Sequence, residues 1–203
     1  MSDYLRSAGL LLVLLNPFLV ILYLVDLVEK LSWRAFARVL LRAALIAGGV
    51  FCAFALLGDA VFSSIMQADF ASFQIFGGVV FLLIGVQFVF RGPTAIEILR
   101  GESEYVAGAI AMPVLVGPGT ISASVIVGQR HDPLSACLIV LSATILSVLA
   151  MALLKAVHDY VRPRNEPLVR RYIEIGGRIM ALVVGTISVQ MIMQGLRAWA
   201  AKF

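Results

Sequence analysis

The sequence predicts an all-α integral membrane protein with six transmembrane helices in two inverted three-helix repeats, with breaks in helices one and four. Three observations lead to this fold class: an apolar composition, six long apolar segments, and two signals that recur in each half. Of the 203 residues, 61% are hydrophobic and 14% are charged, whereas soluble domains are about a quarter charged. The mean hydropathy is +1.00. We therefore expect the lipid bilayer to be the main partner of this chain.

Six segments are long enough to cross the hydrocarbon core, which takes about 20 mostly apolar residues. The first is longer than the core of a signal peptide and has no A-x-A-like cleavage site after it, so we expect it to be retained. The longest connections, 92–104 and 158–172, are too short to hold a soluble domain. The six segments run near 8–28, 38–58, 73–91, 105–128, 134–157 and 176–197.

The placement of basic residues predicts the orientation. Twelve of the 16 Lys and Arg residues lie in or beside the connections that follow the first, third and fifth segments. The positive-inside rule puts these connections in the cytoplasm and both termini outside it, in a bacterial inner membrane. The twelve are Lys30, Arg34, Arg38, Arg42, Arg91, Arg100, Lys155, Arg162, Arg164, Arg170, Arg171 and Arg178.

Two signals recur in the same order in each half. VQFVFRG (86–92) and VQMIMQG (189–195) share the pattern V-Q-x-x-x-x-G, and Asn16-Pro17 and Gly117-Pro118 precede them by similar distances. They predict a first repeat at 1–92, a cytoplasmic connection at 93–104 and a second repeat at 105–203, together forming one membrane domain. Because each repeat has three spans, the second is inverted, as in many secondary transporters.

The Asn-Pro and Gly-Pro pairs predict helix breaks inside the membrane. Proline has no N–H and disrupts the preceding turn, but it is favoured as the first residue of a helix. A helix that begins at membrane depth exposes unpaired N–H groups and the positive end of its dipole, which suits a carboxylate. The hydroxyls and two amides would add polar contacts. The predicted substrate-binding residues are Asn16, Pro17, Gly117, Pro118, Gly119, Thr120, Ser122, Gln87 and Gln190.

Other classes of function have little support in the sequence. No H-E-x-x-H pattern or Ser/His arrangement occurs in the spans, so we expect no enzyme activity, catalytic residue, metal site or cofactor. Cys52 and Cys137 show no disulfide or metal spacing and are expected to be small buried side chains. No basic face interleaved with aromatic residues points to nucleic acid. The sequence leaves the oligomeric state open, a homo-oligomer included.

Several segments resemble those of the MarC family of integral membrane proteins. AIAMPVLVGPGTIS (109–122) is similar to that family's A-I-P-L-hydrophobic-A-G-P-G pattern, and RIMALVVGTISVQMIMQGL (178–196) is similar to its closing segment. Asn16-Pro17 falls at the family's N-P motif, although Phe18-Leu19-Val20 replaces a stretch that often contains glycine. Ala181 stands where glycine is expected. The resemblance covers essentially the whole chain and implies a relative of LysE-type exporters that moves small neutral amino acids.

The function we expect is secondary transport or export of small neutral amino acids across the inner membrane. Access would alternate around a midplane site built from the N-termini of half-helices. Two other functions stay open: a channel for an ion or small solute, and a structural or assembly protein that transports nothing, in which the breaks are packing kinks. The amides of Gln87 and Gln190 could likewise only join helices. The substrate, the direction and the coupling ion are not determined.

Overall fold

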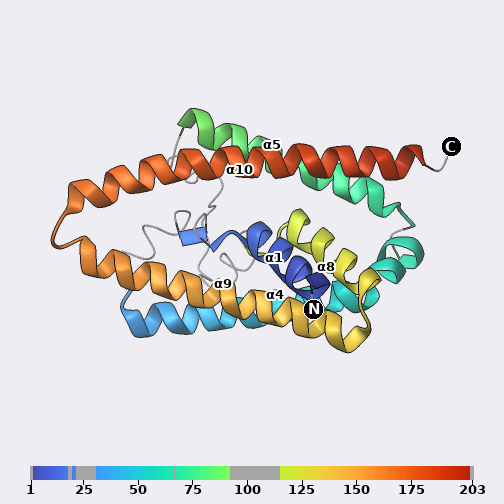
Figure 1. The fold of residues 1–203 in the computed structure, drawn as a ribbon, viewed down its shortest axis with the longest axis horizontal. Coiled ribbons are helices and arrows are strands. Elements are labelled where there is room, and N and C mark those ends of the chain that lie inside the picture. Colours follow the sequence, from blue (N-terminus) through green and yellow to red (C-terminus); the bar gives the residue numbers. More distant parts are fainter. Residues whose placement is uncertain (1, 18–19, 22–30, 66, 92–114, 202–203) are drawn as a thin grey trace.

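The computed structural model describes residues 2–17, 20–21, 31–65, 67–91 and 115–201, and every regular element in these ranges is a helix (Figure 1). The predicted all-α class is therefore confirmed for the described residues. The elements are α1 (Ser2–Leu15), α4 (Trp33–Ala60), the π-helical turn η1 (Val61–Ile65), α5 (Phe70–Arg91), α8 (Pro118–Arg130), α9 (Pro133–Val161) and α10 (Glu166–Ala200).

Four of these helices, α4, α5, α9 and α10, are long and apolar enough to cross a membrane. They correspond to the second, third, fifth and sixth predicted segments. The first and fourth segments are described only in part, since 22–30 and 105–114 lie outside the described residues. The total of six spans and the inverted arrangement therefore stay predictions.

The predicted connection at 158–172 is wrong. α9 continues to Val161 and α10 begins at Glu166, so only four residues separate the two helices. α10 has 35 residues, a length of about 52 Å, which exceeds the hydrocarbon core of about 30 Å. Hydropathy locates only the part of a helix inside the core, and polar residues continue the same helix beyond it. Glu174 and Arg178, an ion pair one turn apart at 3.0 Å, lie where this extension meets the apolar part of the helix.

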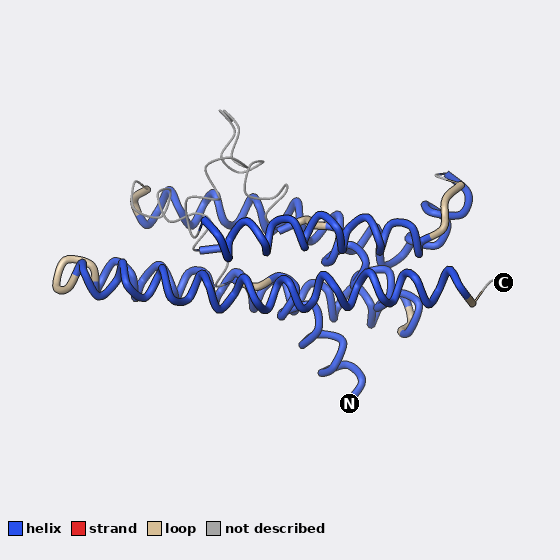
Figure 2. The backbone as a smooth tube through the Cα atoms, turned by 90° about the horizontal axis from the view of Figure 1, so that it is seen from above, coloured by secondary structure: helices blue, strands red, loops and turns tan. Residues whose placement is uncertain are grey.

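The long helices form two antiparallel pairs. α5 lies along α10, and α4 lies along α9 (Figure 1). α8 packs between the pairs, against α4, α9 and α5, whereas α1 packs on α9 and α8. Seen from above, α1 is inclined to the other helices and projects from one side of the bundle (Figure 2). Its N-terminal half is attached to the α8–α9 connection through Ser7 Oγ, which lies 3.0 Å from His131 Nε2.

α4 and α9 carry the same pattern of buried positions. Each begins with a side-chain cap: the Ser32 hydroxyl accepts from the Ala35 N–H in α4, and the Asp132 carboxylate accepts from the Ser135 N–H in α9. The following buried positions recur every three or four residues, the spacing of one helix face. In α4 these are Phe36, Leu40, Ala43, Ala47, Phe51 and Ala55; in α9, one hundred positions later, they are Ala136, Val140, Ala143, Ser147, Met151 and Lys155.

α5 and α10 approach closely because small residues line their contact. A Cβ atom added at Gly78 would lie 2.8 Å from the carbonyl oxygen of Ser188, and one added at Gly85 would lie 3.3 Å from that of Ala181. Close approach through small residues is a common way for helices to pack in lipid, where burial of apolar surface gives no driving force.

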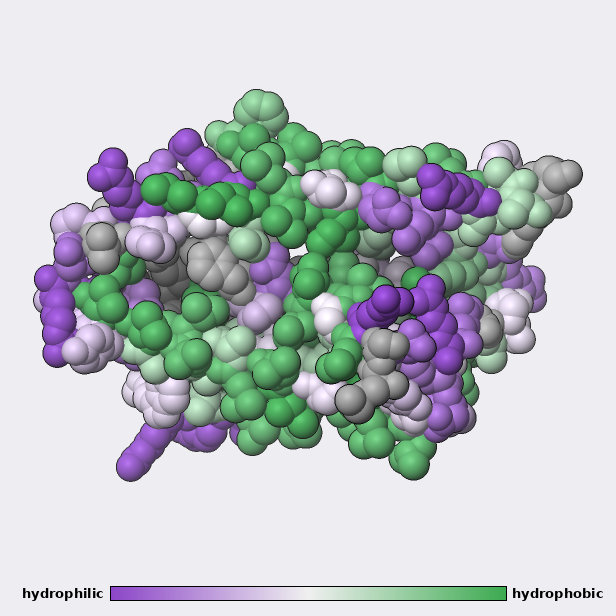
Figure 3. Space-filling model, in the orientation of Figure 1, coloured by the Kyte–Doolittle hydropathy of each residue, from purple (hydrophilic) through white to green (hydrophobic). Residues whose placement is uncertain are grey.

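The surface agrees with a position in a bilayer. Hydrophobic residues fill the middle of the face in Figure 3, and hydrophilic residues gather toward its two ends. The basic starts of α4 and α10 and the ends of α5 and α9 lie at one end of the bundle, and both termini lie toward the other (Figures 1 and 2). The helix ends that carry the predicted basic residues therefore lie at the same end of the bundle. Its assignment to the cytoplasm stays a prediction.

The packing of α4 on α9 can be tested through its cysteines. The thiols of Cys52 on α4 and Cys137 on α9, both half-buried and unbridged, lie close to each other. We expect a short bis-methanethiosulfonate reagent to join them. With a protease site inserted in the 93–104 connection, the cleaved halves would then stay together on a non-reducing gel. The control variant Cys52→Ser should separate, and separation of the unsubstituted protein would contradict the α4–α9 contact.

Candidate functional site

The helix start predicted at Gly117-Pro118 is present, and the helical run expected before it, at 105–114, lies outside the described residues. Gly117 has extended backbone (φ −107°, ψ 168°), Pro118 is the first residue of α8, and the Ile121 N–H donates to the Gly117 carbonyl at 3.0 Å. The Thr120 hydroxyl accepts from the Gly117 N–H at 3.0 Å and lies within 3.0 Å of the Leu115 and Gly117 carbonyls. The N–H groups of Gly119 and Thr120, in the first turn, have no acceptor within the helix.

The break at Asn16-Pro17 also places a residue with non-helical backbone before a proline, but here that residue is an asparagine. Asn16 has φ 39°, a left-handed conformation that asparagine tolerates better than most residues. Its N–H donates to the Leu12 carbonyl at 3.1 Å and ends α1, and its own carbonyl accepts from Val20 at 3.1 Å. In both places the carbonyl of the residue before proline supplies the first acceptor of the helix that follows.

Each break contacts one helix of the α5–α10 pair. Pro118 packs so closely on Gly77 of α5 that no Cβ atom fits there, and a Cβ added at the neighbouring Gly119 would lie 2.5 Å from Phe81. The amide nitrogen of Asn16 lies 3.5 Å from the sulfur of Met180 on α10. The breaks are therefore located where the α5–α10 pair meets the rest of the bundle.

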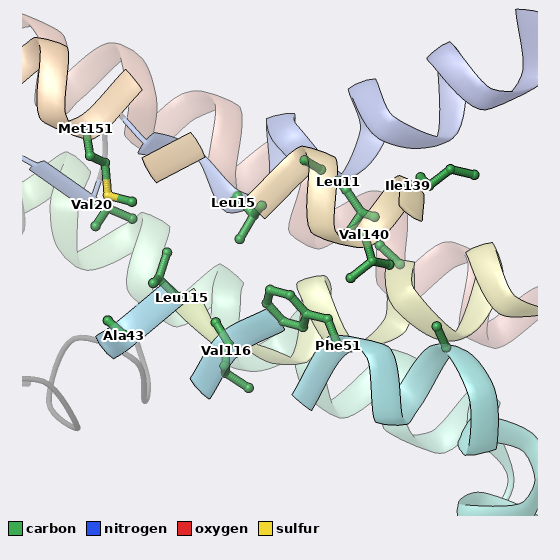
Figure 4. Close-up of a cluster of buried hydrophobic side chains, with 14 of the residues drawn as sticks. Leu11, Leu15, Val20, Ala43, Phe51, Leu115, Val116, Ile139, Val140 and Met151 are labelled. Carbon is green, nitrogen blue, oxygen red and sulfur yellow. The ribbon is translucent and has the colours of Figure 1, made fainter. Parts of the chain in front are cut away.

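The residues beside the two breaks share one buried cluster. Leu15 and Val20 flank the first break, Leu115 and Val116 precede the second, and all four are buried together between α4 and α9 (Figure 4). Segments 100 residues apart in the sequence thus come together in the interior. The sequence analysis expected this meeting of the two breaks.

Hydroxyl groups supply polarity in this apolar surrounding. Thr120, Ser122 and Ser124 are all buried on α8, and the Ser124 hydroxyl donates to the Thr120 carbonyl at 2.8 Å. The Ser122 hydroxyl is 4% exposed and has no hydrogen-bond partner among the described residues. A buried polar group without a partner costs about 1–3 kcal/mol, so Ser122 marks a place where a bound molecule or water would be stabilising.

In the described part of the chain, neither predicted glutamine forms a hydrogen bond with a residue of the two breaks. Gln87 follows Gly77 by ten residues on α5, so it lies about 15 Å further along the helix axis than the contact with Pro118. Its side-chain oxygen is buried and has no partner in the described part of the chain. Gln190 lies on an exposed face of α10. A role for either in binding stays a prediction.

The sequence analysis did not expect Lys155 to be buried. It counted Lys155 among the basic residues beside a connection, yet the side chain is 1% exposed and its Nζ lies 3.0 Å from an Asp159 carboxylate oxygen. The ammonium also lies 5.4 Å from the centre of the Phe36 ring, a cation–π distance. Its burial could have been predicted from its spacing, because Lys155 lies twelve residues after Ala143 on the same helix face of α9.

Comparison with known proteins gives a consistent family assignment. A family model described as MarC family integral membrane protein matches residues 1–200. The chain is 30% identical over 198 residues to a UPF0056 membrane protein of Methanocaldococcus jannaschii, with 91% of each chain covered. It is 24% identical over 197 residues to one of Aquifex aeolicus (92% and 89% covered) and 22% identical over 205 residues to one of Buchnera aphidicola (98% of each). No solved structure matches.

The contact between Pro118 and α5 leads to a prediction about stability. Gly77→Ala puts a methyl group against the proline ring, and overpacking of this kind costs about 1–3 kcal/mol. Gly185→Ala, also inside a long helix, has nothing within 4 Å of its added Cβ and should be neutral or stabilising by about 0.5–1 kcal/mol. Thermal unfolding in detergent measures both. Equal effects of the two substitutions would contradict the close contact at Gly77.

Proposed function

We propose that this chain, which belongs to the MarC family of integral membrane proteins, is a secondary transporter of small solutes that carry a carboxylate, namely small neutral amino acids. One observation supports the proposal above the others: two helix breaks meet in one buried cluster inside an otherwise apolar bundle. Unpaired backbone groups at that depth are costly unless protein, water or a ligand satisfies them.

The inverted repeat that such a transporter needs has support in the contacts. When Gln87 is aligned with Gln190, Gly78 corresponds to Ala181 and Gly85 to Ser188. Gly78 approaches Ser188 while Gly85 approaches Ala181, and this exchange of partners is what a twofold axis produces. Corresponding helices also run antiparallel (Figure 1), as an axis in the membrane plane requires.

The breaks follow the same correspondence. Under the same alignment Gly77, which touches Pro118, corresponds to Met180, which touches Asn16. Together with the shared buried pattern of α4 and α9, this supports a duplication of the whole three-helix unit. The repeat boundaries 1–92 and 105–203 belong to this proposal.

The chemistry of the site favours an anionic group on the substrate. The first turn of α8 directs the N–H groups of Gly119 and Thr120 away from the helix at its positive end, which is worth about 0.3–2 kcal/mol to a nearby anion. No Lys or Arg is among the residues at the two breaks. A carboxylate bound by dipoles and hydroxyls can leave again, which transport requires.

The packing suggests how access alternates. α5 and α10 pack tightly on each other, whereas their main contact with the remaining helices is between α5 and α8. The α5–α10 pair can therefore rock as one body against α1, α4, α8 and α9, with the breaks at the boundary. Such motion opens the site first to one side of the membrane and then to the other.

The experiment is uptake of radiolabelled glycine and alanine into liposomes that contain the purified protein, with and without a proton gradient. We expect saturable uptake that the unlabelled amino acid blocks. The double variant Gly117→Ala/Gly119→Ala should insert into the membrane and lose transport, because the methyl group at Gly119 meets Phe81. Gly49→Ala, with open space around the added Cβ, is the matched control and should transport normally.

Three outcomes contradict the proposal in different ways. Retained transport by the double variant would remove the Gly117-Pro118 break from the site. Flux that neither saturates nor exchanges would favour a channel. No flux of either amino acid through folded protein would exclude them as substrates, and a change of stability alone in the double variant would favour a structural role.

A further inference from the structure

Ser147 has an unpaired hydroxyl in the centre of the bundle. The residue is 0% exposed, and its Oγ has no hydrogen-bond partner among the described residues. Most buried serines in helices donate to the carbonyl four residues earlier, as Ser124 and Thr144 do here. The sequence analysis did not single out Ser147, because one serine in an apolar helix is a common packing residue.

The position of Ser147 connects it to the first break. It lies on the buried face of α9, one turn from Met151 and between that residue and Val140. Figure 4 shows Met151 beside Val20 and Val140 beside Leu11, within one cluster. Leu15 and Val20 are the buried residues on either side of Asn16-Pro17. The stretch of α9 that carries Ser147 therefore runs beside the first break.

Two unpaired buried hydroxyls thus lie at the two breaks. Ser122 is one turn into α8 after Gly117-Pro118, and Ser147 is beside Asn16-Pro17. In the described part of the chain these are the serines or threonines that are buried and lack any partner. Since such groups are costly, their occurrence at both breaks is better explained by a shared ligand than by packing.

The two halves differ at this position. The residue one hundred positions before Ser147 is Ala47, which occupies the corresponding place in the buried pattern of α4. Figure 4 shows Leu115 beside Ala43 and Val116 beside Phe51, so the Ala47 stretch runs beside the second break. The stretch of α4 beside the second break thus has a methyl group at this position, and the stretch of α9 beside the first break has a hydroxyl. A ligand held between them meets different chemistry at its two ends.

We infer that Ser147 is a ligand-binding residue of the transport site, which accepts a hydrogen bond from a cationic amino group of the substrate. The inference rests on the proposed function. The first turn of α8 supplies N–H donors, which suit a carboxylate, whereas an ammonium group needs an acceptor. The serine oxygen has lone pairs for this contact. The substrate class is then a small zwitterion with a carboxylate toward α8 and an ammonium toward α9.

The test compares Ser147→Ala with Ser142→Ala in the liposome assay. Ser147→Ala should raise the KM for glycine by about tenfold to a hundredfold, the effect of losing one hydrogen bond to a charged group. Inhibition by acetate, which has the carboxylate and lacks the ammonium, should not change when both sides are strongly buffered. Ser142→Ala removes a hydroxyl on the exposed face of the same helix, where it donates to the Ile139 carbonyl at 2.8 Å, and should keep the KM of the unsubstituted protein. Ser147→Cys, with a poorer acceptor of similar size, should give an intermediate KM.

Thermal unfolding separates this role from a structural one. Because the hydroxyl is unpaired in the folded protein, Ser147→Ala should keep or raise the unfolding temperature while it weakens glycine uptake. A lowered unfolding temperature would indicate a structural role and overturn the inference.

The remaining outcomes are also decisive. An unchanged KM for glycine in Ser147→Ala, or an equal change for glycine and acetate, overturns the inference and leaves the proposed transport intact. Absence of saturable glycine uptake by the unsubstituted protein overturns the proposed function, and this inference with it.

Discussion

The main constraint on this structure is that a backbone amide inside a bilayer must have a hydrogen-bond partner. Most of the described chain meets it with helices that continue without interruption from one side to the other. The two interruptions meet it locally. At the second break the Gly117 N–H donates a hydrogen bond to the Thr120 hydroxyl. At the first break the N–H and the carbonyl of Asn16 both have backbone partners in the adjoining helical turns. The backbone groups of Gly117 and Asn16 are therefore paired although both residues lie outside a regular helix.

The other helices are arranged so that each break packs against a neighbouring helix. A glycine on α5 admits the Pro118 ring, and a flexible methionine on α10 meets Asn16. Glycines also bring α5 and α10 close enough to behave as one unit. On the opposite side, alanines at positions 43, 47, 136 and 143 let α4 and α9 approach each other and the interrupted helices. Small residues thus allow the close contacts at the breaks and within each helix pair.

Sequence differences between the two halves make the two ends of the bundle chemically different. A perfectly symmetric pair of repeats would bind a ligand equally in two orientations. Here Ser147 and Lys155 stand where the first half has Ala47 and Ala55. Lys155 adds a buried cation, its carboxylate partner Asp159 and the Phe36 ring near the basic end of the bundle. These side chains distinguish the two ends of a molecule whose backbone pattern is shared.

The sequence by itself determined that the chain lies in a membrane, the position of four long helices and the places where the chain breaks. These features depend on local hydropathy and on the covalent chemistry of proline, asparagine and glycine, which act within a few residues. It failed at the polar ends of helices, as between Val161 and Glu166, because hydropathy stops at the edge of the hydrocarbon. Only the tertiary structure decided which helix faces each break, that Cys52 meets Cys137, and that Ser147 and Lys155 are buried. Burial of a residue on a helix depends on which side its neighbours cover, and contacts between residues far apart in the sequence set that.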